Sequence, residues 1–559
     1  MNRRLVVVAM LAVCAAVFSL TGTEGSGTIR FEDVTARAGV DFIANGCPTL
    51  TKNQPETMLA GVALIDYDND GYLDLYFVNG ADINSLRKDS DKYKNRLFHN
   101  NRDGTFTDVT DKAGVGGDGY DIAAAVGDYD NDGWQDLYVA GVSSNHLYRN
   151  NHDGTFSDVT AKAGVGGGVY RGLKMWGASA GWVDYNNDGK LDLFVSNYCR
   201  WEAGKEPVCL GGGRLRGYCH PKVFEPLPAT LYRNNGDGTF TDVSDQTGIA
   251  RKLGKGMGVA FNDYDGDGFT DIFVANDNMA NSLFHNIGGK RFEEVALRAG
   301  VAYNADGREI GGMGAEFRDL DNDGRPDIWH TATELDTFPL FRNNGGGTFT
   351  DMTARSGLGK ATMEMSGWSN AVGDFDNDGW KDLFVARSNV LDNVAEFSSR
   401  SYGEPNSIFR NLGGMKFADV SAEAGPALQV SAAHRGAVAG DLFNDGRLDL
   451  VVTVLNGKAK VLRNVTENGG NWVTFQLEGR KSNRMGIGAQ VKITTEDGAS
   501  QYDMVSTSGG YGASRDPRAH FGLGRFRSVR EVDIRWPSGA RQVLKDVEGN
   551  AIHRVREPE

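Results

Sequence analysis

The sequence is short of proline, of basic stretches and of histidines arranged as in a metalloprotease. It holds 13 prolines and 9 histidines among 559 residues, while hydrophobic residues still make up 40%. This apolar share excludes a disordered chain, and 75 glycines indicate many tight turns. The net charge is −15 and no basic stripe is present, which argues against a nucleic-acid partner, because such binding depends on neutralising phosphates.

Long apolar runs are missing after the first twenty residues. Arg3 and Arg4 precede a mostly apolar run from Leu5 to Phe18, which is too short to span a membrane comfortably. A basic start and a short apolar core predict a signal peptide over residues 1–23, with an uncleaved anchor as the alternative. We therefore expect an exported protein, secreted or periplasmic, without a membrane span in the mature chain.

Cysteine is sparse as well, and only Cys47, Cys199, Cys209 and Cys219 follow the signal segment. An even number of cysteines in an exported chain predicts two disulfides. We expect the pairs Cys209–Cys219 and Cys47–Cys199. A zinc site that uses Cys219 and His220 is the alternative, although the gaps between the cysteines match no usual zinc spacing.

The chain is rich in an acidic nine-residue loop, which first occurs from Asp66 to Asp74. It carries carboxylates at positions 1, 3, 5 and 9 and glycine at position 6. Two charges ~4 Å apart repel by about 4 kcal/mol at an effective dielectric constant of roughly 20. A cation relieves this repulsion, and ligands that are all oxygen favour calcium before magnesium. The glycine permits the sharp turn that brings the carbonyl of position 7 to the ion.

Seven copies of this loop occur, and a solvated acidic turn is the alternative reading of each. The predicted ligands of the five complete copies are Asp66, Asp68, Asp70 and Asp74; Asp128, Asp130, Asp132 and Asp136; Asp263, Asp265, Asp267 and Asp271; Asp319, Asp321, Asp323 and Asp327; and Asp374, Asp376, Asp378 and Asp382. Those of the third copy are Asp184, Asn186, Asp188 and Asp192, because an amide oxygen can still ligate. The seventh copy keeps Asp441, Asp445 and Asp449. Its position 3 is Phe443, so that site is doubtful and we expect about six Ca²⁺ ions per chain.

Each acidic loop lies between two short β-branched or aromatic runs, and a second pair of such runs follows. Four strands per repeat predict the blades of a β-propeller. We therefore expect an all-β fold, with a seven-bladed propeller over residues 24–470 and a cysteine-containing insertion at about 197–228. Residues 28–35 look like the fourth strand of a unit, whereas the seventh unit has its first three strands only. We predict that residues 28–35 complete the last blade.

The acidic loops stop near residue 470. Runs such as Trp472–Leu477 and Val529–Trp536 look like strands that are separated by glycine-containing turns. Residues 471–557 are therefore predicted to form a second, small all-β domain that resembles a sandwich.

Two sets of motifs resemble known families. Asp-x-Asp-x-Asp-Gly-x-x-Asp followed by Leu-Tyr-Arg-Asn-Asn-x-Asp-Gly-Thr-Phe resembles the FG-GAP/VCBS repeats of integrin-α-type propellers. The stretches Pro55–Ala63, His520–Gly524 and Arg535–Gly539 resemble the ASPIC/UnbV (cartilage acidic protein-like) family. The resemblance covers nearly the whole mature chain and implies a calcium-binding propeller with the family's C-terminal domain. It implies no settled activity, and Phe443 departs from its motif.

One stretch, Gly177–Gly181, matches the Gly-x-Ser-x-Gly pattern of hydrolases, but it lies in a predicted strand instead of a strand–turn–helix. We therefore expect a calcium-stabilised protein-binding or adhesion-type module without enzymatic activity, whose connecting loops recognise the partner. A lectin-like carbohydrate binder is one alternative, and an enzyme with its site at the mouth of the propeller channel is the other. The partner is an unknown protein or glycan.

Overall fold

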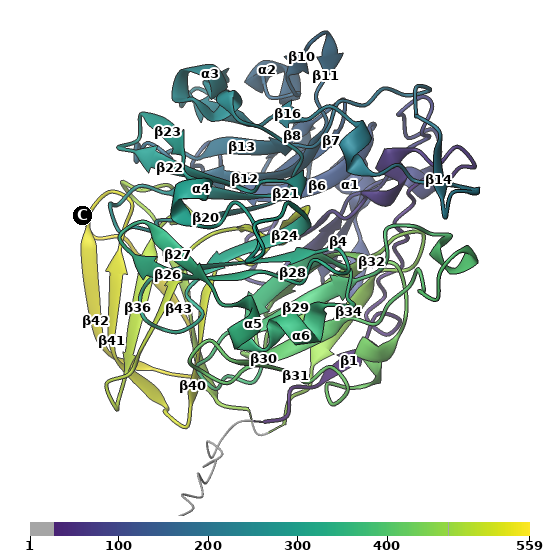
Figure 1. Ribbon diagram of the computed structural model, residues 1–559. Coiled ribbons are helices and arrows are strands. Elements are labelled where there is room, and N and C mark those ends of the chain that lie inside the picture. The colour runs from purple at the N-terminus through teal and green to yellow at the C-terminus, as the bar shows by residue number, and fades with distance from the viewer. Residues whose placement is uncertain (1–26, 468) are drawn as a thin grey trace, which may run out of the picture.

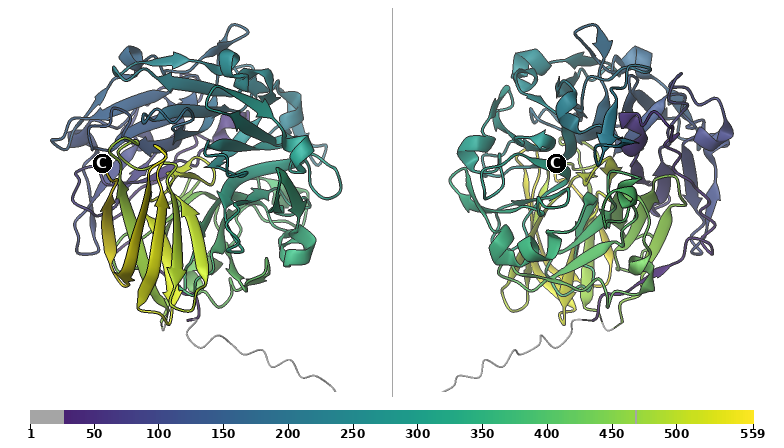
Figure 2. Two further views of the ribbon diagram at one scale, coloured as in Figure 1. Left: turned by 90° about the vertical axis from the view of Figure 1, so that its left-hand side faces the viewer. Right: turned by 45° about the vertical axis from the view of Figure 1, so that its right-hand side comes forward.

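The computed structural model describes residues 27–467 and 469–559, and it is an all-β, propeller-like structure (Figure 1). Figure 2 shows sheets arranged in a ring, with the C-terminal strands (yellow) packed against one face of that ring. The all-β prediction is confirmed. Among the described residues, none of the helices combines the length and the apolar character that crossing a membrane requires. The predicted signal peptide lies outside the described residues.

Within residues 27–467, seven units of four antiparallel strands follow one another. Units 1 to 3 are β2 (Val62–Ile65), β3 (Asp74–Phe77), β4 (Arg96–Asn100) and β5 (Phe106–Asp108); β6 (Tyr120–Gly127), β7 (Asp136–Val142), β8 (His146–Asn150) and β9 (Phe156–Asp158); and β12 (Gly177–Val183), β13 (Asp192–Asn197), β17 (Thr230–Asn234) and β18 (Phe240–Asp242). Units 4 and 5 are β20 (Gly256–Asn262), β21 (Asp271–Met279), β22 (Ser282–Ile287) and β23 (Arg291–Glu294); and β24 (Ile310–Arg318), β25 (Asp327–Ala332), β26 (Leu340–Gly345) and β27 (Thr348–Asp351). Units 6 and 7 are β28 (Gly367–Gly373), β29 (Asp382–Arg387), β30 (Ser407–Asn411) and β31 (Phe417–Asp419); and β32 (His434–Gly440), β33 (Asp449–Val454), β34 (Lys460–Asn464) and β1 (Phe31–Asp33).

Short helices and strand pairs fill the connections. In unit 1, for example, the Asp108 carboxylate accepts hydrogen bonds from the backbone N–H (3.0 Å) and the hydroxyl (2.6 Å) of Thr110, which starts a helical turn after the fourth strand. The helices are α1 (Thr110–Ala113), α2 (Thr160–Ala163), α3 (Ser244–Thr247), α4 (Ala296–Ala299), α5 (Thr353–Ser356), α6 (Leu358–Thr362) and the 3₁₀ turns η1 (Gln54–Thr57), η2 (Asp91–Tyr93), η3 (Pro221–Val223), η4 (Ile249–Arg251), η5 (Val394–Glu396) and η6 (Pro426–Gln429). The extra strand pairs are β10 (Val169–Tyr170) with β11 (Leu173–Lys174), β14 (Cys209–Gly211) with β15 (Leu215–Gly217), and β16 (Leu227–Pro228) with β19 (Leu253–Gly254).

The N-terminal strand completes unit 7. β1 pairs antiparallel with β34, and Phe31 lies opposite Asn464. The Phe31 side chain is buried and meets Phe375 edge to face, with the ring centres 5.6 Å apart. The prediction that residues 28–35 complete the last unit is therefore confirmed. The two ends of the ring are held together by backbone hydrogen bonds and this aromatic contact.

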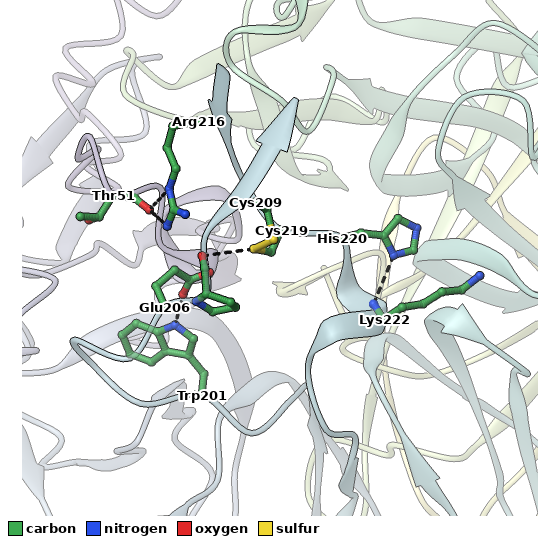
Figure 3. The surroundings of a disulfide bond; sticks show 9 residues. Thr51, Trp201, Glu206, Cys209, Arg216, Cys219, His220 and Lys222 are labelled. Carbon is green, nitrogen blue, oxygen red and sulfur yellow. Dashed lines mark hydrogen bonds between the residues drawn. A yellow bond between two sulfur atoms is a disulfide. The ribbon is translucent and has the colours of Figure 1, made fainter. Parts of the chain in front are cut away.

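The connection between β13 and β17 contains the predicted disulfide, Cys209–Cys219, which joins the start of β14 to the segment after β15 (Figure 3). The Arg216 guanidinium in this hairpin donates to the backbone carbonyl of Thr51 in the N-terminal loop. Because Cys219 is in a disulfide, the alternative zinc site with His220 is wrong. The His220 imidazole instead accepts a hydrogen bond from the backbone N–H of Lys222.

The predicted Cys47–Cys199 disulfide is wrong, because both residues are free thiols. Cys199 is fully buried near Lys255, and burial raises the pKa of its thiol. Cys47 lies beside the hydroxyl of Tyr93. The two side chains share one apolar cluster but face different neighbours.

The C-terminal strands form two sheets. One contains β40 (Ala519–Gly524), β35 (Asn471–Glu478) and β43 (Ile552–Arg556), and the other contains β37 (Ser500–Met504), β36 (Gln490–Thr495), β41 (Ser528–Arg535) and β42 (Arg541–Glu548). Most of their buried apolar side chains belong to one cluster that also includes residues of units 2 and 3, such as Trp182. The core of these sheets is therefore continuous with that of the ring.

A hairpin from the C-terminal region enters the centre of the ring. It consists of β38 (Ser508–Gly509) and β39 (Ala513–Ser514), and β39 pairs in parallel with β2 of unit 1. The hairpin also forms hydrogen bonds with the first strands of units 2 to 6, through Val126, Ser179, Val259, Ala315 and Ser369. It therefore fills the axis on which the innermost strands converge.

The tip of this hairpin meets η1 from the N-terminal region. Tyr511 is fully buried, and its hydroxyl donates to the backbone carbonyl of Met58 at 2.7 Å. All four residues of η1 are buried as well. The stretch Pro55–Ala63 near the N-terminus and the C-terminal hairpin are thus brought together on the axis of the ring.

Closure of the ring by β1 predicts a large stability loss when its buried aromatic ring is removed. Phe31→Ala should lower the free energy of unfolding by about 3–5 kcal/mol, because a buried phenylalanine is replaced by a cavity. The neighbouring Glu32 is exposed, so Glu32→Ala should change it by less than about 0.5 kcal/mol. Chemical denaturation of both variants measures this difference, and equal effects would show that β1 does not close the ring.

Candidate metal centres on the acidic face

Each acidic loop connects the first and second strands of its unit, and its own backbone fixes its first and last carboxylates. In unit 1, the two Asp66 oxygens accept from the N–H groups of Asp70 and Gly71 at 2.9 and 3.0 Å. Asp74 accepts from the N–H groups of Tyr67 (3.1 Å) and Asn100 (2.7 Å). All seven copies repeat the bond from the third-strand asparagine to the last aspartate.

In several loops the structure brings predicted ligands close together. In these loops, three acidic or histidine ligand atoms lie within 4.8 Å of one another, as for Asp66, Asp68 and Asp70. The position 9 aspartates are at most 1% exposed in every loop. These carboxylates are thus crowded in a medium where charge is poorly screened.

The donor set fits a hard cation. The position 3 aspartate has one buried oxygen without a hydrogen-bond partner in four loops: Asp68, Asp130, Asp321 and Asp376. A buried oxygen without a partner carries a desolvation cost that a bound ion would remove. The side chains at positions 1, 3, 5 and 9 would hold such an ion, which would supply positive charge to neutralise the loop.

Burial raises the pKa of the loop carboxylates, and like charges in the same loop add to this effect. The pKa rises to about 6 for Asp66, Asp319 and Asp441, and to about 7 for Asp74, Asp128, Asp184, Asp271 and Asp376. Desolvation also raises the pKa of Asp136, Asp192, Asp327, Asp382 and Asp449 well above the ordinary value. Without a cation, some of these carboxylates are therefore protonated near neutral pH.

A basic residue of the third strand faces most loops, and the sequence analysis missed this role. The Arg149 guanidinium donates to Asp130 and Asp132 at 2.6 and 2.8 Å, and Arg410 contacts its own loop in the same way. His99 takes this place in unit 1, with Nδ1 3.3 Å from Asp74. The corresponding residues of units 4, 5 and 7 are His285, Arg342 and Arg463. The sequence does show these basic residues, because they occupy the third position of the repeated Leu-Tyr-Arg-Asn motif.

The seventh loop lacks the position 3 ligand, and its arginines take the place that Arg325 and Arg342 have at Asp323 in loop 5. The Arg463 guanidinium lies over the Phe443 ring, 4.4 Å from its centre. The Asp445 carboxylate contacts Arg463 at 3.1 Å and Arg447 at 2.5 Å. Arginine thus supplies the positive charge at this loop.

Asparagines of the third strands connect every unit to its neighbour. Asn150 Nδ2 donates to the backbone carbonyl of Tyr67 in the preceding loop at 2.8 Å, and Asn100 closes the circle by donating to Leu442 of unit 7 at 2.9 Å. Equivalent bonds start from Asn234, Asn286, Asn343, Asn411 and Asn464. Each buried hydrogen bond of this kind contributes about 1 kcal/mol to the free energy of unfolding.

A second circle of asparagines comes from position 4 of the acidic loops, and it is broken once. Six of these residues donate through Nδ2 to the backbone carbonyl of the position 6 glycine in the next loop: Asn69, Asn131, Asn187, Asn322, Asn377 and Asn444. In the loop of unit 4 this position is Gly266, which has no side chain. We name these six bonds the outer asparagine ring.

The C-terminal sheets dock on the outer asparagine ring. The side-chain oxygen of Asn131 accepts from the backbone N–H of Arg484 at 2.9 Å. The Asn444 oxygen accepts from the Arg518 guanidinium at 2.7 Å, and the Asn377 oxygen lies 2.9 Å from His520 Nε2. The C-terminal region therefore contacts the acidic loops of units 2, 6 and 7.

Comparison with known families agrees with this architecture. The FG-GAP-like repeat family matches residues 66–139, 128–195, 228–274, 263–330 and 332–385, just over half of the chain, and the ASPIC and UnbV family matches residues 479–559. The chain belongs to the FG-GAP-like repeat family and ends in an ASPIC and UnbV segment. The predicted resemblance is confirmed.

This FG-GAP-like repeat protein has relatives among animal proteins. Human cartilage acidic protein 1 is 25% identical over 526 residues, which cover 90% of this chain and 72% of the relative. The mouse protein of the same name is also 25% identical and is covered over 74% of its length. Among solved structures, an Agrocybe aegerita lectin that recognises non-reducing terminal N-acetylglucosamine matches with a TM-score of 0.41 and 17% identity, covering 74% of this chain and 90% of the lectin. BBS1N in complex with ARL6DN matches with a TM-score of 0.41 and 11% identity, covering 77% of this chain and 97% of that one.

The raised pKa values predict how the stabilisation by calcium depends on pH. Between the ordinary pKa near 3.8 and the folded-state values of about 6 to 7, the calcium-free folded state binds more protons than the unfolded state, so its loops lose stability as pH rises. Protons also compete with the cation. The rise in melting temperature on adding calcium should therefore be small at pH 5 and large at pH 7.5.

Thermal melting of protein freed of divalent ions on a chelating resin, with and without added calcium at both pH values, measures this difference. Burial lowers the pKa of His330, His434 and His520 to about 4, so these histidines change stability with pH in the opposite direction. Their contribution cancels when the melting temperatures with and without calcium are subtracted at each pH. A calcium effect that is equal at the two pH values, or larger at pH 5, would contradict the prediction.

Proposed function

We propose that this protein is an exported, calcium-stabilised β-propeller of seven blades that acts as a protein-binding module of adhesion type. Residues 24–470 would form the propeller and residues 471–557 the C-terminal domain, which would dock on the acidic face. The proposed ligands of the ions are the acidic-loop residues of the first six units, with Asn186 in the third. The proposed localisation outside the cytoplasm rests on the predicted signal peptide at residues 1–23 and agrees with the Cys209–Cys219 disulfide.

The unpartnered position 3 oxygen is the observation that carries the calcium proposal. It recurs in four loops that are separate in sequence, and around Asp68 and Asp130 further Asp ligand atoms lie within 4.8 Å. A single acidic turn explains neither the recurrence nor the burial. In the seventh loop, where Phe443 replaces this ligand, two arginines pair with Asp445.

Exposed apolar side chains on the connection between β13 and β17 support a protein partner. Val208 is 78% exposed, and Leu210 and Val223 are each 54% exposed. Leu50, in the neighbouring N-terminal loop, is 93% exposed. Apolar side chains that a disulfide and neighbouring loops hold in place are typical of a recognition surface.

The filled axis argues against the alternative of an enzyme at the channel mouth. The hairpin of β38 and β39 occupies the centre, and Tyr511 contacts Met58 there. Ser179, the serine of the Gly-x-Ser-x-Gly stretch, lies inside β12, where its hydroxyl accepts a hydrogen bond from the backbone N–H of Gly512. This serine therefore has a structural role.

Removing one ligand in an intact loop should reduce the stabilisation by calcium. A site held at 100 times its dissociation constant adds about 2.7 kcal/mol to the free energy of unfolding. Asp376→Asn removes the charge of a position 3 ligand in loop 6, so it should lower the calcium-dependent gain by up to about this amount. Denaturant unfolding with and without calcium measures the gain.

The matched control is Asp445→Asn in the seventh loop, where we expect no ion. Asp445 pairs there with two arginines. This variant should keep the full calcium-dependent gain, although its stability without calcium changes. Equal loss of the gain in the two variants would contradict the assignment of sites, and no gain in the unmodified protein would contradict the proposed function.

A further inference from the structure

The break in the outer asparagine ring coincides with a cavity. Where Gly266 leaves the loops of units 4 and 5 unbridged, a cavity of about 260 Å³ lies between these loops and strands β36, β37 and β41. Roughly nine water molecules of ~30 Å³ would fill this volume, so it admits one small ring-sized ligand. Gly266 has a positive φ of 77°, like the asparagines at this position, and a Cβ added there would meet no atom within 4 Å.

The two walls of the cavity differ in charge. The loop wall carries Asp263, Asp265 and Asp319, together with Arg325, which is paired with Asp323. On the wall of C-terminal strands, the two acids are already neutralised, because Asp503 pairs with Arg318 and Asp533 pairs with Arg541.

The cations on the C-terminal wall are Lys492 and Arg535. In the part of the chain that the structure describes, neither has a carboxylate within 4.0 Å. The Lys492 ammonium lies 5.4 Å from the centre of the Tyr502 ring. One wall therefore presents two cations without acidic partners next to an aromatic side chain.

Apolar side chains also line the cavity, and we call them its floor. They are Val491, Met504 and Tyr264, which are buried, and Pro326. Pockets that combine an apolar surface with a few fixed polar groups bind small organic ligands. Here the polar groups are cations on one side and carboxylate oxygens on the other.

We propose that this cavity binds an acidic saccharide unit, a monosaccharide with a carboxylate. The carboxylate would contact Arg535 and Lys492, the apolar face of the sugar would pack on the floor, and its hydroxyls would donate to oxygens of the loop wall. A neutral sugar leaves the two cations unused. Asp263, Asp265 and Asp319 are proposed calcium ligands, and bound calcium would repel the ammonium group of an amino acid, so the choice of a sugar rests on the proposed function. The inference goes beyond the protein-binding role proposed above.

Titration calorimetry of the full mature chain in calcium-containing buffer tests the proposal with D-glucuronate, D-glucose and glycine as probes. D-Glucuronate should bind more tightly than the other two. Arg535→Gln should weaken its binding at least about tenfold, because a charge-assisted contact is lost. Arg530→Gln, on the same strand but outside the cavity, should leave binding unchanged.

The variant Gly266→Asn gives a second, independent test. By analogy with the other six loops, the new side chain should donate to the Gly324 carbonyl and fill the mouth of the cavity. We expect this variant to lose D-glucuronate binding without a lower melting temperature. Gly307→Asn is the control, because Gly307 also has a positive φ (71°) and open space but lies outside the cavity. Its D-glucuronate binding should be normal.

The proposal is overturned if D-glucuronate does not bind, if D-glucose or glycine binds as tightly, or if Arg535→Gln or Gly266→Asn binds it normally. Thermal melting of the same samples with and without calcium separates this failure from a failure of the proposed function. If calcium still raises the melting temperature but D-glucuronate does not bind, the saccharide site is contradicted and the proposed function is not.

Discussion

Repulsion among carboxylates on one face of the ring is the constraint on which the rest of this structure depends. The acidic loops hold 26 of the 74 acidic residues, and their last aspartates are almost completely buried. Two kinds of positive charge can offset this repulsion. Side chains of the third strands, such as Arg149 and His99, reach the outer oxygens, while the remaining buried oxygens fit a divalent ion. In the seventh loop, where position 3 is Phe443, the positive charge beside Asp445 comes from arginine side chains.

The same loops also hold the ring together. Third-strand asparagines bridge all seven junctions, and the outer asparagine ring bridges six. Both kinds of bond use backbone carbonyls of the acidic loops, so a change in loop geometry acts on neighbouring units and on the C-terminal sheets that dock there. Tyr511 carries this connection to the axis, where it meets Met58. The acidic face, the C-terminal sheets and the axis are therefore one connected structure.

Repeated local spacing made much of this architecture predictable. The acidic loops, the four strands per unit, the closing strand β1 and the Cys209–Cys219 disulfide all follow from short-range patterns. Contacts between distant segments were not predictable in this way. Tyr511 and Met58 are 453 positions apart and carry no periodic signal. The pairing of Cys47 with Cys199 was wrong because nothing local placed the two thiols. The role of the third-strand basic residues was visible in the repeats but required knowledge of which side chains face the loops.

The number of ions bound per chain tests the central claim most directly. Native mass spectrometry of the mature protein, dialysed against calcium and then against calcium-free buffer, gives this number. The account predicts about six calcium ions per chain, one for each loop that keeps its position 3 oxygen ligand. A chain that binds none, and whose melting temperature is the same with and without calcium, would contradict it.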